Sequence, residues 1–322
     1  MDATLAPSRR NPLANLLRRK EAAILIALLL LTLVIAVIAP RFVSGTNLYQ
    51  VSRQISFVAI VALGELFVIL TGGIDLSVGS VMGWAGMVSA WAMVALGLSP
   101  PLAILVGVAA GVAMGAINGS LIAYVKLPPF IATLGMLSFA YGLVLGLSKG
   151  WPITGLPRSF HWVAQGSILY LPVPVWIAGL LAVTAHVVLT YTAFGRRTYA
   201  IGGNEQATFL SGIDIDRIKF VLYMISAGLA AISGVVLTSR FGSAQPDTGR
   251  GWELDAIAAA VIGGTSLAGG SGTVLGVVIG ACIMGVLRSG LVMMGIDPYW
   301  HISIIGVVIV LAAVLDVKTK KA

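Results

Sequence analysis

Ten long apolar runs restrict what this sequence can fold into. Each is close to the roughly 20 residues that a helix needs to cross the hydrocarbon core of a bilayer. The runs lie at residues 22–39, 51–70, 78–97, 101–123, 130–148, 173–192, 218–238, 253–268, 273–294 and 299–317. The pattern predicts an all-α fold, a polytopic transmembrane helical bundle of about ten spans.

The composition supports one membrane domain without a separate soluble one. The chain is 58% hydrophobic and 10% charged, whereas soluble domains carry about 25% charged residues. We therefore expect a transmembrane domain over 22–317 with short tails at 1–21 and 318–322. The first run has no small-residue cleavage site after it, so we interpret it as an uncleaved helix rather than a signal peptide. The single cysteine and the scattered histidines predict no disulfide and no metal site.

The positions of the basic residues indicate an orientation. With ten spans and the N-terminus inside, most of the 20 lysines and arginines fall in interior segments, so both termini are predicted to be cytoplasmic. The tryptophans, apart from Trp84, then fall near the outer face, where indole rings prefer to lie. Basic residues confined to short segments between apolar runs are typical of membrane orientation and argue against nucleic-acid binding.

Two glycine-rich segments predict broken or re-entrant helices. Residues 72–79 and 263–270 both read GGxxLxxG, and a serine follows each. Transporters often use paired broken segments at corresponding positions. Chance similarity in a glycine-rich membrane chain is the alternative.

The segment from Ile69 to Ser80 is the most distinctive in the chain. Its two glycines permit a helix to end, and Asp75 can accept hydrogen bonds from the N–H groups that open the next helix. Direct contact between Asp75 and a transported solute is the alternative. Glu65 lies ten residues earlier, and its carboxylate should face the bundle interior or a wet path because ionised groups in hydrocarbon are costly. The candidates for a translocation path are Glu65, Gly72, Gly73, Asp75 and Ser77.

Three ordered motifs resemble the ribose-type family of ABC sugar permeases. They are TGGIDLSVGS at 71–80, AIGGN at 200–204 with LSGI at 210–213, and ELDAIAA at 253–259 followed by 261–264. The resemblance implies the permease subunit of a bacterial ATP-driven importer of a monosaccharide or similar small polar solute. It implies as partners a second permease chain, a cytoplasmic ATPase dimer that carries ATP and Mg, and a periplasmic sugar-binding protein. The expected location is the bacterial inner membrane, in contact with the lipid bilayer.

This chain has no phosphate-binding loop, because none of its lysines stands in a GxxxxGK[ST] context. We therefore expect no catalytic residue and no cofactor in this chain. An ion-coupled secondary transporter is the alternative function. Such proteins place ionisable groups within their spans, but nothing in the sequence pairs Glu65, Asp75, His186 and Arg288.

The basic interior loop at 193–219 is the predicted coupling element. Asn204 suits a helix N-cap and Gly212 suits the position past a helix end, leaving room for about two turns between them. The resemblance implies contact with the ATPase here. The candidate residues are Arg196, Arg197, Gly203, Asn204, Glu205, Ala207, Ser211 and Gly212. An ordinary loop held by anionic lipid is the alternative.

Three arginines in the predicted outer loops are candidates for docking a binding protein. They are Arg158, Arg240 and Arg250. The resemblance implies that permease cations meet acidic residues of that partner, whereas each loop could instead be simply solvated. The identity of the solute, and whether the permease pairs with itself or with another chain, stay open at this point.

Overall fold

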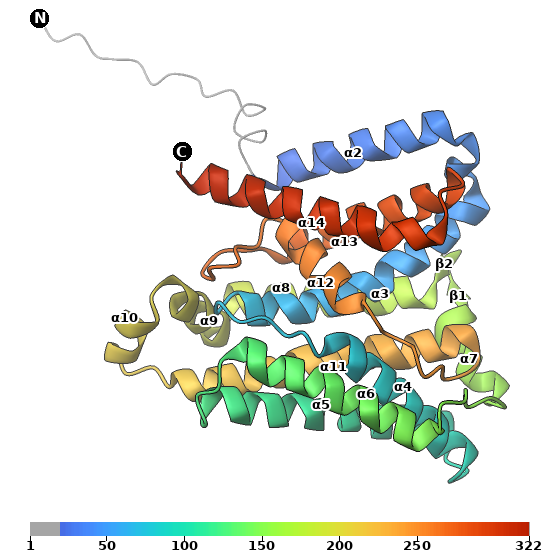
Figure 1. Ribbon diagram of the computed structural model, residues 1–322, viewed down its shortest axis with the longest axis horizontal. Coiled ribbons are helices and arrows are strands. Elements are labelled where there is room, and N and C mark those ends of the chain that lie inside the picture. Colours follow the sequence, from blue (N-terminus) through green and yellow to red (C-terminus); the bar gives the residue numbers. More distant parts are fainter. Residues whose placement is uncertain (1–19, 322) are drawn as a thin grey trace, which may run out of the picture.

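The computed structural model describes residues 20–321 as a bundle of roughly parallel and antiparallel helices (Figure 1). Most of the predicted N-terminal tail at 1–21, and Ala322, lie outside the described residues. The long helices are α2 (Lys20–Ile38), α3 (Gly45–Ile69), α4 (Val78–Val94), α5 (Pro100–Ala123), α6 (Pro129–Ser148), α8 (Val173–Tyr191), α11 (Ile215–Phe241), α13 (Val274–Met293) and α14 (Pro298–Lys321). The shorter elements are η1 (Pro40–Val43), α7 (Arg158–Gln165), β1 (Ser167–Ile168), β2 (Leu171–Pro172), α9 (Ala193–Gly203), α10 (Glu205–Leu210) and α12 (Trp252–Ile262).

Seven helices within the described residues are long and apolar enough to cross a membrane: α2, α3, α5, α6, α8, α11 and α13. The predicted all-α helical membrane fold is therefore confirmed, whereas the count of about ten spans stays a prediction. The run at 253–268 is shorter than predicted, because α12 has 11 residues and ends at Ile262. At 1.5 Å per residue such a helix is about 16 Å long, roughly half of the hydrocarbon thickness. The rest of that run forms a glycine-rich turn.

Helix α11 occupies the centre of the bundle, where it packs against α3, α4 and α5. Most residues of α3 and α11 are buried, as expected for helices surrounded by other helices. Helix α2 lies at one edge (Figure 1) and exposes Leu29, Leu33 and Val37. Such an apolar surface is stable against lipid rather than water.

Proline and hydroxyl residues mark several helix starts. Helices α5 and α6 begin with Pro100 and Pro129, where the missing N–H has no helical partner to lose. Thr273 caps α13 by accepting the N–H of Gly276 at 3.0 Å. The sequence thus fixes the ends of these helices locally.

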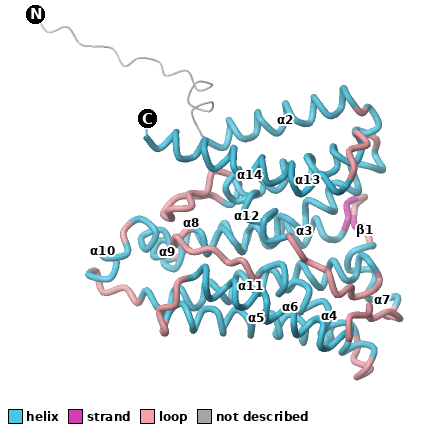
Figure 2. The backbone as a smooth tube through the Cα atoms, viewed as in Figure 1, coloured by secondary structure: helices cyan, strands magenta, loops and turns pink. Residues whose placement is uncertain are grey.

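Helices α4 and α12 begin in the middle of the bundle. Figures 1 and 2 show the loop after α3 returning from the α10 end to the middle, and the loop after α11 reaching the middle from the α7 end. A Cβ atom on Gly249 would lie 2.0 Å from the oxygen of Gly79, so the two starts are in direct backbone contact. Starts of two helices inside the bundle are the arrangement that the predicted broken segments require.

The segment at 149–172 is partly structured rather than a plain loop. It contains α7 and an antiparallel hairpin that pairs Ser167 with Pro172 and Ile168 with Leu171. This hairpin is a small exception to the all-α prediction. Ile153 also forms an antiparallel bridge with Ala244, which ties this segment to the loop between α11 and α12.

Candidate functional site

A cluster of five buried polar residues, here called the polar centre, lies where α3, α4, α5 and α11 meet. Glu65 Oε2 accepts the backbone N–H of Asp75 at 3.5 Å. Asp75 accepts the N–H and the hydroxyl of Ser77 at 3.0 and 2.5 Å, and the hydroxyl of Ser226 at 3.1 Å. Asn118 donates to Ser77 Oγ at 3.0 Å. All five residues are fully buried.

Asp75 organises the turn that leads into α4. Gly72 has a φ of +76°, a conformation that glycine adopts without strain, and it follows the end of α3. The N–H that Asp75 accepts belongs to Ser77, immediately before α4. This geometry favours the interpretation of Asp75 as the residue that opens the helix over direct contact with a solute.

Some polar groups of this region have no hydrogen-bond partner among the described residues. They are Glu65 Oε1, Asn118 Oδ1 and the hydroxyl of Tyr223, all of them buried. A buried unpaired group costs about 1–3 kcal/mol. The polar centre therefore keeps capacity for further hydrogen bonds.

The predicted coupling element consists of two helices, α9 and α10. Asn204 caps α10 as predicted, since its Oδ1 accepts the N–H of Ala207 at 2.9 Å. Gly212 follows the helix with a φ of +77°. All eight candidate coupling residues, from Arg196 to Gly212, are exposed. This end of the bundle thus presents a short, well-capped helix to its surroundings.

Three backbone segments meet at what we call the glycine junction: Leu70–Gly72, Gly202–Gly203 and Ala268–Gly270. Gly270 N–H donates to the oxygen of Leu70 at 2.9 Å. A Cβ on Gly202 would lie 1.8 Å from that oxygen and 2.3 Å from Gly270 N. The two glycine-rich segments found in the sequence therefore lie against each other and against the end of α9.

Tyr199 of α9 reinforces this junction. Its hydroxyl donates to the oxygen of Gly272 at 2.8 Å. Burial raises the pKa of the Tyr199 hydroxyl, so at neutral pH the group stays protonated and can donate. Helix α9 is thus attached to the turn between α12 and α13.

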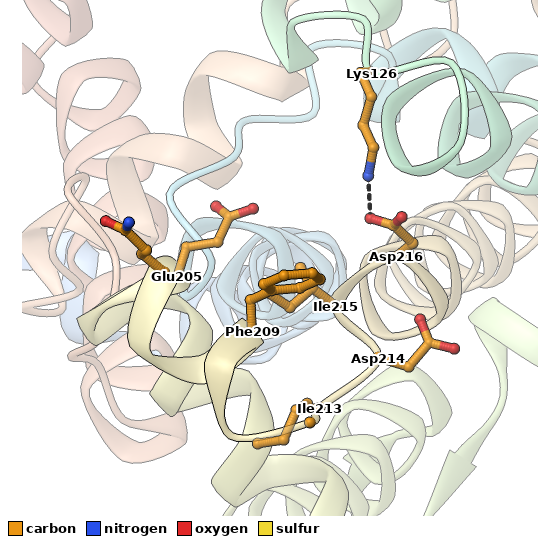
Figure 3. A pocket seen from close by; sticks show the side chains of 9 residues that line it. Lys126, Glu205, Phe209, Ile213, Asp214, Ile215 and Asp216 are labelled. Atoms are coloured by element: carbon orange, nitrogen blue, oxygen red, sulfur yellow. Dashed lines mark hydrogen bonds and ion pairs between the residues drawn. The ribbon is translucent and has the colours of Figure 1, made fainter.

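A cavity of about 730 Å³, here called the α10 cavity, opens beside helix α10. Figure 3 shows Lys126 reaching Asp216 from the turn between α5 and α6, while Glu205 and Phe209 of α10 lie on the other side. Lys219 holds Glu205 at 2.7 Å. Sequence reasoning missed Lys126, Phe209 and Asp216 as parts of this surface, because the contacts join segments about 90 residues apart.

An ion pair between a buried aspartate and a partly exposed arginine joins α12 to α13. Arg288 lies 2.5 Å from Asp255. The sequence pattern pairs none of Glu65, Asp75, His186 and Arg288 with one another. In the structure Arg288 pairs with Asp255, which is not one of these four, and the carboxylate of Glu65 accepts the backbone N–H of Asp75. Both contacts depend on how broken helices fold back, which spacing alone does not reveal.

Comparisons with known proteins show which family this chain belongs to. The family described as branched-chain amino acid transport system / permease component matches residues 47–313. The chain belongs to this permease family. No solved structure matches it.

Several curated relatives of the permease are sugar permeases by name. It is 42% identical to the ribose import permease protein of Escherichia coli (strain K12) over 302 residues, covering 92% of this chain and 94% of the relative. It is 43% identical to the ribose import permease protein of Bacillus subtilis (strain 168), with 91% of each chain covered. The D-allose transport system permease protein of Escherichia coli (strain K12) is 40% identical, with 85% and 84% covered. The resemblance to ribose-type permeases is confirmed.

The three arginines predicted to dock a partner occupy different settings in the permease. Arg158 is exposed at the first position of α7. Arg240 is half-buried, with its guanidinium 5.6 Å from the ring centre of Phe57. Arg250 lies 5.8 Å from the ring centre of Tyr141. Of the three, Arg240 and Arg250 therefore also make contacts within the chain.

Proposed function

We propose that this chain is the membrane-spanning subunit of an ATP-driven importer of a monosaccharide or similar small polar solute. The observation that carries the proposal is the identity of 42% to a ribose import permease over 92% of the chain. The family description mentions branched-chain amino acids. The relatives that match 85–92% of the chain are named for ribose, allose and xylose, and this favours a sugar.

The proposed importer contains a second permease chain, a cytoplasmic ATPase dimer and a periplasmic sugar-binding protein. ATP and Mg bind to the ATPase in this proposal. The capped and exposed helix α10 supports a role as the element that seats in a groove of the ATPase. The contact surface consists of Arg196, Arg197, Gly203, Asn204, Glu205, Ala207, Ser211 and Gly212.

The proposed orientation places the α10 end in the cytoplasm and the α7 end outside. Ten helices lie in the inner membrane, with α12 as a half-length one, and both termini are cytoplasmic. The basic residues of the segment before α11 support this assignment. Arg158, Arg240 and Arg250 then lie at the outer end, where the binding protein would dock.

Glu65, Gly72, Gly73, Asp75 and Ser77 remain the proposed lining of the inner half of the path. Gly72 is exposed, whereas the other four are buried and would reach the solute only when α4 and α12 separate. This requirement fits an importer that is opened by ATP, because the ATP-driven conformational change would then expose the polar side chains of the path to the solute.

Ion-coupled transport is the second candidate. The observation in its favour is the buried contact between Glu65 and the turn holding Asp75, since intramembrane carboxylates often carry protons or bind sodium. The full-length identity to ribose permeases favours the ATP-driven function.

Reconstitution separates the two candidates. Proteoliposomes that hold the permease, its ATPase and its binding protein should take up D-ribose or D-allose only with ATP, and the permease alone should hydrolyse no ATP. Uptake driven by a proton or sodium gradient without ATP would refute the importer proposal.

A further inference from the structure

A second cavity, here called the α11–α12 cavity, lies at the α7 end of the bundle. Its volume is about 360 Å³, near the lower limit of about 300–1,000 Å³ for small-molecule sites. It lies between the end of α11, the loop that returns to the middle of the bundle, and the start of α12. The lining residues are Leu237, Phe241, Gln245, Asp247, Thr248, Gly249 and Trp252.

The polar groups of this cavity are largely unpaired among the described residues. Thr248 Oγ1 is buried without a hydrogen-bond partner. Gln245 uses its NH₂ on Ser243 Oγ at 2.9 Å, which leaves its carbonyl oxygen free. The carboxylate of Asp247 accepts no hydrogen bond from the described residues. Among the residues that line the cavity, two acceptors and one hydroxyl thus have no hydrogen-bond partner within the described part of the chain.

The walls of the cavity are held in place by close packing. The indole ring of Trp252 meets the edge of Phe57, with ring centres 6.3 Å apart. Gly249, with a φ of +85°, rests on the backbone of Gly79. Gly249 lines the cavity, so its contact with Gly79 brings the start of α4 close to the cavity. Gly79 lies only two residues after Ser77 of the polar centre.

We propose that the α11–α12 cavity is the site where the permease receives its solute, and that this solute is a neutral monosaccharide. This inference rests on the proposed function. The apolar face of a sugar ring would lie on Trp252, while its hydroxyls donate to Asp247 and Gln245 and exchange hydrogen bonds with Thr248. A carboxylate can accept from two hydroxyls at once, and such charge-assisted bonds are stronger than neutral ones.

The lining argues against an amino acid as the occupant. The carboxylate of an amino acid needs a cation or several N–H donors, because leaving it unpaired is costly. Neither lysine nor arginine is among the described residues that line the cavity, and the neighbouring guanidinium of Arg240 lies over the rings of Phe57 and Phe241. A polyol, which carries no charge, meets both the acceptors and the aromatic wall.

The test measures sugar binding to the permease without its binding protein. The full chain, with its ATPase, is placed in lipid nanodiscs, and saturation-transfer NMR records D-ribose, D-allose and L-leucine at millimolar concentration. Asp247→Asn leaves packing unchanged because Asp247 is exposed, and Trp252→Leu removes the aromatic wall. Trp300→Leu is the matched control, since Trp300 is exposed on α14 and does not line the cavity.

We expect one of the sugars to bind the wild-type chain, with affinity falling at least about tenfold in Asp247→Asn and Trp252→Leu but not in Trp300→Leu. Equal binding by wild-type and Asp247→Asn chains, binding of leucine alone, or no signal at all would overturn the inference. ATP-dependent uptake by the complete wild-type importer is measured separately. If the importer takes up sugar but the cavity variants bind it as the wild-type chain does, only the assignment of the cavity is refuted. If the importer takes up no sugar, the proposed function is refuted.

Discussion

Replacing Gly202 by alanine would place a methyl group inside the glycine junction. The new Cβ would lie 1.8 Å from the oxygen of Leu70 and 2.3 Å from Gly270 N, where real Cβ atoms keep at least 3.0 Å from other heavy atoms. Neither neighbour can yield easily, because both are backbone atoms and are hydrogen-bonded to each other. Overpacking of this kind typically costs about 1–3 kcal/mol. The end of α9 must therefore move by roughly 1 Å or more away from the two turns.

Gly203 provides a matched control one residue along. A Cβ on Gly203 meets no heavy atom within 4 Å, and alanine favours a helix over glycine by about 1 kcal/mol. We expect both variants to reach normal membrane levels. Because Gly203 belongs to the proposed contact surface, ATPase binding is measured for both variants and uptake is compared at equal amounts of bound ATPase. Gly202→Ala should lose at least about tenfold in ATP-dependent uptake, since each 1.4 kcal/mol corresponds to a factor of ten.

The assay compares uptake and ATP hydrolysis in proteoliposomes that contain the complete importer. Loss of uptake with continued hydrolysis in Gly202→Ala would indicate that α9 no longer moves the two turns. Equal uptake by the alanine variants of Gly202 and Gly203 would refute the reasoning, because the junction would then transmit nothing.

Three further predictions concern other parts of the chain. Gly212→Val should weaken ATPase binding, because a β-branched residue at a φ of +77° costs about 1–3 kcal/mol. Asn204→Ala should weaken it less, because a lost N-cap costs about 0.5–2 kcal/mol. If Gly212→Val bound the ATPase as well as the wild-type chain in a pull-down, the coupling surface would lie elsewhere. Gln206 and Tyr170 are both exposed. A cysteine at Gln206 should react with an impermeant reagent only from the cytoplasm, and a cysteine at Tyr170 only from outside. The reverse labelling would invert the proposed topology. Glu65→Gln should fold and assemble, since the amide oxygen can still accept the N–H of Asp75, but should change the rate or selectivity of sugar uptake; unchanged uptake kinetics would leave Glu65 a structural role only.

The helices and their ends were predictable because they depend on local chemistry. Apolar runs of span length became helices, and Asn204 and Gly212 bracket α10 as their side-chain and backbone preferences require. The glycine pairs correctly indicated helix breaks. The extent of α12 was not predictable in the same way, because apolar residues continue past Ile262 into a turn that packs against other backbone segments.

Side-chain partners across the bundle were not predictable from one sequence. Asp255 and Arg288 are 33 positions apart, and only the antiparallel packing of α12 on α13 brings them together. The α11–α12 cavity was missed for a similar reason. Its residues were interpreted as an outer loop, whereas Gly249 carries that loop into the bundle as far as Gly79.

The contacts of Gly79 and Gly202 together suggest how the two ends of the permease communicate. At the start of α4, Gly79 supports the loop that lines the α11–α12 cavity. Ser77, just before α4, is hydrogen-bonded to Asp75, and the N–H of Asp75 is bonded to Glu65 of α3. Directly after α3, Leu70 accepts the N–H of Gly270. Backbone contacts with so little space transmit displacement rather than absorb it, because close-packed interiors deform little. A shift of α9 by the proposed ATPase partner would therefore reach α4 and α12 at their starts, beside the residues proposed to line the solute path.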